Sequence, residues 1–183
     1  MSTTQQVTAV PTGTWVTDPV HSSLGFAVKH MVVATFRGSL TDFEATLTSA
    51  EDGTTSLVGV GRVASVVLQD ENLSAHVQSP DFFDAERYPE VRYESSDVAV
   101  EDGRLVVRGQ ITLKGVTKPL ELHGELVGPI EDPYGNTKIG VTLEGTVDRT
   151  EFGLNWNAPL PAGGGFVVGN DVKLTAELEL GKA

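Results

Sequence analysis

Residues 171–180 read Asp-Val-Lys-Leu-Thr-Ala-Glu-Leu-Glu-Leu, and apolar residues occupy every second position from Val172 to Leu180. Successive side chains of a β-strand point to opposite faces, so this stretch predicts a strand with one apolar and one polar face. The same alternation occurs earlier in the chain at residues 105–113, 120–126 and 139–147. The chain is therefore predicted to consist mainly of half-buried antiparallel strands.

Turn sequences separate these segments, among them Glu-Asp-Gly at 101–103, Asp-Pro-Tyr-Gly-Asn at 132–136 and three glycines at 163–165. Counting the segments predicts roughly eight strands, at residues 13–17 leading into 22–30, then 36–48, 55–68, 91–99, 104–114, 117–128, 138–148 and 168–180. Within 36–48 the apolar parity changes between Leu40 and Phe43, which predicts a bulge or bend.

Strands of this kind either pair as two sheets or close into a barrel, and closure removes exposed strand edges. A closed barrel of about eight strands is either filled by its own side chains or holds one small ligand. The alternation does not choose between these two interiors.

One stretch departs from the alternation. Asp70 and Glu71 precede Leu73 and Val77, whose spacing places them on one face of a helix. A proline at the first helical position is favourable, so Ser-Pro-Asp at 79–81 predicts a second helical turn. We therefore expect one or two short helices around residues 70–88, covering one end of the barrel.

Length and composition favour one globular domain. The chain has 183 residues, 39% of them hydrophobic and 21% charged. Residues 1–12, rich in Thr and Gln, are predicted to form a flexible tail, and residues 13–183 a single domain.

Charge and cysteine content exclude several function classes. With 13 basic and 25 acidic residues, the formal charge of −12 disfavours nucleic-acid binding and stable membrane insertion. The chain has no cysteine, which excludes disulfides and thiolate catalysis. Residues 1–10 lack the basic and apolar regions of a signal peptide, so a cytoplasmic location is expected.

Three motifs closely resemble those of the YceI-like family, often called polyisoprenoid-binding proteins. They are Trp15-x-x-Asp18-x-x-His21-Ser22, then Gly-x-Ile-Thr-Leu-x-Gly-Val-Thr-Lys-Pro at 109–119, then Arg-x-x-Phe-Gly-Leu-x-Trp at 149–156. The resemblance covers roughly residues 13–180. It implies an all-β, eight-stranded antiparallel lipocalin-like barrel with an elongated apolar tunnel. The chain departs from the family where Leu73-Ser74 precede Ala75-His76, since that family usually has Arg-Asp before this histidine.

The resemblance also implies a ligand: a polyisoprenoid, an isoprenoid quinone or a fatty-acid-like lipid. The residues then expected to contact it are Phe26, Val28, His30, Phe36, Phe43, Phe82, Phe83, Phe152, Leu154 and Trp156, with His21 at the barrel mouth. Each has an alternative interpretation. The aromatic residues could fill a closed core, His30 could be a hydrogen-bonded core residue, and His21 could stabilise a turn with Asp18.

No cofactor or metal is expected, because the four histidines fall in no compact ligand spacing. No Gly-x-Ser-x-Gly motif is present, so the protein is expected to bind or transport its ligand without catalysis. Arg62 and Arg149 could neutralise a diphosphate headgroup or form exposed salt bridges. Two other functions stay open: an enzyme acting on a hydrophobic substrate with His21 as base, or a structural module without ligand. A homodimer is suggested by the resemblance alone.

Overall fold

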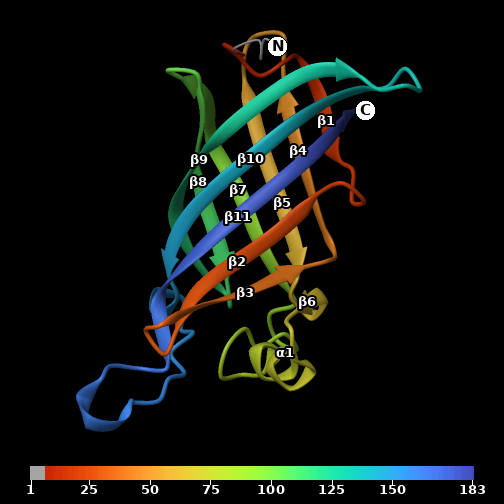
Figure 1. The fold of residues 1–183 in the computed structure, drawn as a ribbon. Helices are drawn as coiled ribbons and strands as arrows, with labels where there is room; N and C mark the ends of the chain where they lie inside the picture. The colour runs from red at the N-terminus through yellow and green to blue at the C-terminus, as the bar shows by residue number, and fades with distance from the viewer. Residues whose placement is uncertain (1–6) are drawn as a thin grey trace.

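The structure is a computed structural model that describes residues 7–183, and strands dominate it (Figure 1). Within the described residues the strands are β1 (Gly13–Thr17), β2 (Ser23–His30), β3 (Ala34–Leu40), β4 (Phe43–Ser49), β5 (Thr55–Arg62), β6 (Val66–Val67), β7 (Glu90–Glu101), β8 (Arg104–Leu113), β9 (Val116–Glu131), β10 (Thr137–Asp148) and β11 (Val168–Lys182). The α-helix is α1 (Glu71–Gln78), and short 3₁₀ helices occur at Val63–Ser65, Arg149–Phe152 and Pro161–Gly163.

Eight of the strands close an antiparallel barrel. Their hydrogen-bonded order is β1-β4-β5-β7-β8-β9-β10-β11, and β11 returns to β1. In that closing pair Trp15 lies opposite Lys182, and Thr17 lies opposite Leu180. The predicted eight-stranded antiparallel barrel is confirmed.

β11 is long enough to have two different neighbours along one edge. Its last residues pair with β1, whereas its first part pairs with β2, where Leu174 lies opposite Phe26. β2 continues into β3, which in turn pairs with β6. A Cβ atom added at Gly61 of β5 would lie 3.0 Å from a methyl group of Leu40, so the Leu40 side chain of β3 reaches across to β5. β2 and β3 therefore complete the wall in the half of the barrel that β1 does not reach.

The bend expected between Leu40 and Phe43 is present, because β3 ends at Leu40 and β4 begins at Phe43. The expected strand at 55–68 is also divided, since a 3₁₀ turn separates β5 from β6.

α1 forms where the acidic start predicts it. The Asp70 side chain accepts hydrogen bonds from the backbone N–H groups of Asn72 and Leu73, at 2.8 and 3.1 Å, and so caps the helix. No second helix is formed between residues 79 and 88, but a hydrogen-bonded turn begins at the predicted place. Ser79 is extended, with ψ of 168°, as the residue before a proline prefers, and its carbonyl oxygen accepts a hydrogen bond from Phe82 N–H at 3.0 Å. The chain instead turns back, and Asp84 N–H donates to Ser79 O at 2.9 Å.

The interior near β1 is tightly filled. Trp15, Leu47, Leu105, Ile139 and Leu180 are each exposed by 1% or less. We call this region, in which inward side chains from β1, β4, β8, β10 and β11 meet, the packed end. Figure 1 shows it at the opposite end of the barrel from α1.

The expected flexible tail lies partly outside the described residues, because residues 1–6 are not described. Of the remainder, Val10 is only 9% exposed, and Pro11 O accepts a hydrogen bond from Trp15 Nε1 at 2.9 Å. Within residues 7–183, no helix has the length and apolar character needed to cross a membrane.

Candidate ligand-binding cavity

The half of the barrel near α1 contains a cavity of about 470 Å³. This volume falls within the range of about 300–1,000 Å³ that small-molecule sites occupy. Every long strand contributes to the lining, and α1 and the segment after it cover the remaining side through Leu73, His76, Val77, Phe82 and Phe83. Almost all of the lining is apolar, as a binding site for a long hydrocarbon chain requires.

On the side away from α1, the cavity ends at the packed core. Leu57, Tyr93, Leu143 and Leu178 line the cavity and also belong to the buried cluster that continues into the packed end. The Tyr93 hydroxyl hydrogen-bonds to the carbonyl oxygens of Leu120 and Val107, at 3.0 and 3.3 Å. Burial raises the pKa of Tyr93 to about 12, so the phenol stays neutral and presents an apolar ring.

The space itself results from small residues on the inner face of β4 and β5. Leu57, Gly59 and Gly61 share one strand face, and Ala45 lies opposite Gly59. A Cβ atom added at Gly59 would have only Glu44 O near it, at 3.9 Å. The sequence-based list of candidate residues omitted these glycines, although their alternation with Val58 and Val60 is visible in the sequence.

The structure brings most of the expected ligand contacts together around this space. Those that line it are Phe26, Val28, His30, Phe36, Phe43, Phe82, Phe83, Leu154 and Trp156. Phe152 does not line it, because its side chain is 2% exposed within the hydrophobic core. His21 does not line it either, since 62% of its side chain is exposed on the outside of the barrel.

Three aromatic rings pack together at the end of the cavity beside α1, which we call its mouth. His76 of α1 contacts Phe82 and Trp156 edge-on, with ring centroids 5.1 and 5.0 Å apart. Its Nε2 lies 3.0 Å from Oδ2 of Asp81, so the imidazole is held by a carboxylate outside the cavity. His76 was not among the expected contacts, but Leu73, His76 and Val77 have the spacing of one helix face.

Arg149 lies beside the mouth, but its guanidinium group hydrogen-bonds to backbone carbonyl groups. It is 4% exposed and donates to the carbonyl oxygens of Leu154, Trp156, Val168 and Gly169. Burial lowers the pKa of the Arg149 guanidinium. The side chain thus joins the two ends of the loop between η2 (Arg149–Phe152) and β11, and it forms no exposed salt bridge. Arg62, in contrast, pairs with Glu90 at 2.8 Å and with Glu44 at 3.5 Å.

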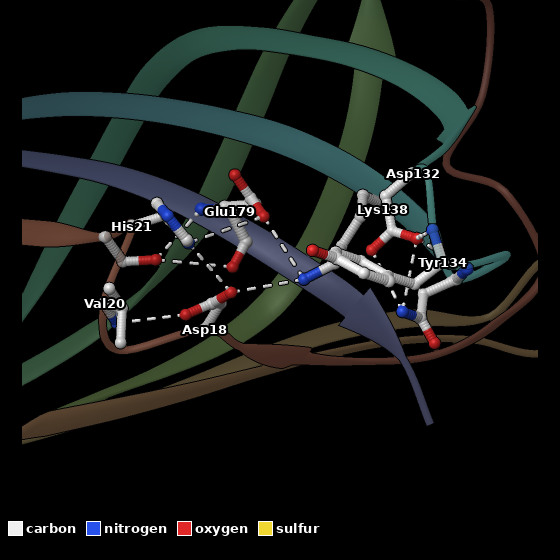
Figure 2. A network of polar contacts seen from close by, with 9 residues as sticks. Asp18, Val20, His21, Asp132, Tyr134, Lys138 and Glu179 are labelled. Atoms are coloured by element: carbon white, nitrogen blue, oxygen red, sulfur yellow. Dashed lines mark hydrogen bonds and ion pairs between the residues drawn. The ribbon is translucent and has the colours of Figure 1, made fainter.

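His21 belongs to a charged cluster on the outer surface (Figure 2). Its Nδ1 lies 3.1 Å from Oδ2 of Asp18, and Lys138 Nζ lies 3.2 Å from carboxylate oxygens of both Asp18 and Glu179. Hydrogen bonds from His21 and Lys138 lower the pKa of Asp18 to about 2. The hydrogen bond to Asp18, with the charges of Asp18 and Glu179, raises the pKa of His21.

The ligand atoms of Asp18, His21 and Glu179 lie within 4.8 Å of one another, a spacing that a metal ion could bridge. The Lys138 ammonium already pairs with both carboxylates and offsets one of their two negative charges, which disfavours a second cation there. The cluster therefore links the β1–β2 connection, β10 and β11 through ion pairs and hydrogen bonds.

Comparisons with known proteins agree with this architecture. A family model described as the YceI-like domain matches residues 15–180. A UPF0312 protein from Photorhabdus laumondii is 33% identical over 142 residues, which cover 76% of this chain and 73% of the relative.

Solved structures show the same fold. Burkholderia cenocepacia BcnA aligns with a TM-score of 0.76 at 20% identity, covering 89% of this chain and 98% of BcnA. A polyisoprenoid-binding domain from Saccharophagus degradans, implicated in plant cell wall breakdown, aligns with a TM-score of 0.64 at 11% identity, covering 94% and 100% of the two chains.

Proposed function

The chain belongs to the YceI-like family, and from that premise we propose that its cavity binds one long apolar molecule, without catalysis, for storage or transport. The proposed ligand is a polyisoprenoid, an isoprenoid quinone or a fatty-acid-like lipid. The observation that carries this proposal is the hollow, apolar half of the barrel, which Gly59 on the inner face of β5 helps to keep open. The polyisoprenoid-binding neighbour from Saccharophagus degradans supports the same ligand class.

Affinity in such a site comes mainly from the apolar area removed from water. Each buried CH₂ group contributes about 0.8 kcal/mol, so a chain of many methylenes binds well without a polar anchor. The proposed contacts are the lining residues Phe26, Val28, His30, Phe36, Phe43, Phe82, Phe83, Leu154 and Trp156. Phe152 and His21 are left out of this proposal, because neither faces the cavity.

The two alternative functions have less support. An enzyme with His21 as base requires this imidazole at the cavity, but it lies on the outer surface beside Lys138. A structural module without ligand requires a filled interior, whereas the interior holds about 470 Å³ of space. The cytoplasmic location stays a prediction from the sequence, and the homodimer stays a prediction from the family resemblance.

The first experiment identifies the ligand. The protein is purified without detergent and extracted with organic solvent, and the released molecules are identified by mass spectrometry. A stoichiometric isoprenoid, quinone or fatty-acyl species supports the proposal. Protein that is recovered empty is then offered a fluorescent prenyl chain, and failure to take it up counts against the proposal.

A matched pair of glycine variants tests whether the cavity is the binding site. Gly59→Leu extends a side chain into the cavity and is expected to lower prenyl uptake about tenfold or more, because the leucine occupies space that the ligand needs. Gly140→Leu is the control, since Gly140 lies between the inward-facing Ile139 and Val141 on β10 and has only Val127 nearby, at 3.9 Å. Equal uptake by both folded variants would refute the assignment.

A further inference from the structure

Two loops meet beside the mouth of the cavity, and both present apolar side chains to solvent. The β2–β3 turn contains Met31, Val32 and Val33, which are 41%, 63% and 85% exposed. The loop before β11 contributes Phe166, which is 60% exposed. We call these four residues the apolar rim.

The rim is one continuous surface. Met31 N–H donates to Val167 O at 2.8 Å, and His30 pairs with Val168 across β2 and β11. A Cβ atom added at Gly165 would lie 3.5 Å from Val32, so the two loops touch each other. His30, Val167 and Val168 also line the cavity, which places the rim directly at its entrance. Figure 1 shows the loop before β11 projecting beyond the end of the barrel, beside the β2–β3 turn.

The β2–β3 turn holds these side chains at a conformational cost. Met31 and Val32 have φ angles of 55° and 66°, a region in which a β-branched residue such as valine is a clear outlier. Asparagine and glycine suit such a turn far better. Apolar side chains that are both exposed and strained contribute little to folding, so this turn has the character of a site retained for contact with another surface.

The charge of this region differs from that of the rest of the molecule. The chain carries 25 acidic residues and a formal charge of −12, yet no acidic residue occurs between Asp18 and Asp42. No charged residue of either sign occurs between Glu151 and Asp171, the segment that includes Phe166. The exposed Lys29 and Arg37 stand behind the tip of the turn, on β2 and β3.

We propose that the apolar rim docks the mouth of the cavity onto the surface of a phospholipid bilayer. Projecting loops with apolar tips insert among lipid headgroups, and basic residues behind them meet the phosphate level. Asp70 and Glu71 begin α1 on the other side of the mouth, so only the side that carries the apolar rim docks. Because these two acidic residues repel anionic headgroups, docking favours zwitterionic over anionic lipid. The net charge of −12 keeps the contact reversible.

A bilayer fits these observations better than a second copy of the chain does. The rim consists of projecting tips rather than a flat face, and two copies of charge −12 repel each other. A docked mouth would also let an apolar ligand pass between bilayer and cavity without crossing water. This last consequence rests on the proposed function, but the docking itself does not.

The test is flotation with phosphatidylcholine vesicles. Wild-type protein is expected to float with the vesicles, and Val32→Asp/Phe166→Asp is expected to lose about tenfold or more of the bound fraction, because two apolar anchors become charged. The matched control is Ile130→Asp/Tyr134→Asp. These residues are 63% and 89% exposed at the other end of the barrel, and the control should float as wild type does.

A second variant separates docking from folding. Met31→Asn/Val32→Gly gives the turn the residues that positive φ angles favour, so its thermal midpoint should rise by about 2–4 °C while vesicle binding falls. The proposal is overturned if wild type does not float or if Val32→Asp/Phe166→Asp floats equally well. It is also overturned if the rim variants convert a wild-type dimer to a monomer without any effect on vesicles.

Prenyl uptake from cyclodextrin, in the absence of vesicles, keeps the two proposals distinguishable. All rim variants should take up the chain as wild type does, because the substituted side chains do not line the cavity. Vesicle binding without any uptake would remove the proposed function and leave the docking intact.

Discussion

The packed end and the hollow end of the barrel are built from the same strands but have opposite interiors. Near β1 the inward residues are large, as with Trp15, Leu47 and Leu180, and they exclude solvent almost completely. Near α1 the inward positions of β4 and β5 are Phe43, Ala45, Gly59 and Gly61, of which only Phe43 is large, and a cavity remains. One end of the barrel therefore stabilises the fold, while the other end is free to hold a ligand.

Removing the largest side chain of the packed end gives the strongest expected effect. Trp15→Ala should lower the free energy of unfolding by about 3–5 kcal/mol, because the deletion leaves a cavity that the rigid barrel cannot close. Urea unfolding measures it. A loss below about 1 kcal/mol would mean that this end is not the main source of stability.

Phe36 and Phe152 offer a matched test of the same contrast. Phe36→Ala should weaken prenyl binding by about 1.5–3 kcal/mol and change stability little, since the ring faces the cavity. Phe152→Ala should do the reverse, with a stability loss of about 3–5 kcal/mol and unchanged affinity, because this ring is buried in the core. Fluorescence titration and urea unfolding of both variants supply the measurements. Similar effects of the two variants on affinity and on stability would contradict the division into a ligand-binding end and a packed end.

The smallest expected effect is a pH dependence of stability, and it arises from the charged cluster around His21. The pKa of His21 is raised in the folded protein, so its contribution to stability is complete below about pH 6.5 and is lost as pH rises through the raised value. The difference in thermal midpoint between wild type and His21→Gln should therefore shrink from about pH 5.5 to pH 9, while prenyl affinity stays the same. A difference that is constant with pH would show that the imidazolium contributes nothing.

Alternation in the sequence was sufficient to predict the half-buried antiparallel strands and the bend before Phe43, because it reports which face of a strand is buried. The closed eight-stranded barrel was predicted from the family resemblance. The Asp70 cap likewise located α1. Alternation does not report how much volume the inward side chains fill together, and this sum over many strands decides between a core and a cavity. For that reason Phe152 appeared equivalent to Phe36, and the decisive Gly59 and Gly61 were overlooked.

The predictions of a second helix and of the role of Arg149 failed for a related reason. Both depend on backbone hydrogen bonds that composition does not predict: those that turn the chain back after Ser79, and those from one guanidinium to the carbonyl groups around it. His21 was expected at the barrel mouth because Asp18, three residues upstream, could orient its imidazole towards a headgroup. This spacing does not say whether the side chain faces inward or outward.

The closing role of β11 has a consequence for biosynthesis. This strand is the last in chain order, yet it pairs with β10, with β2 and with β1, whose residues Trp15–Thr17 are made first. A nascent chain therefore cannot close either half of the barrel until residues 168–182 have left the ribosome. Until then β1, β2 and β10 expose unpaired edges beside apolar faces, and such edges invite aggregation or capture by chaperones.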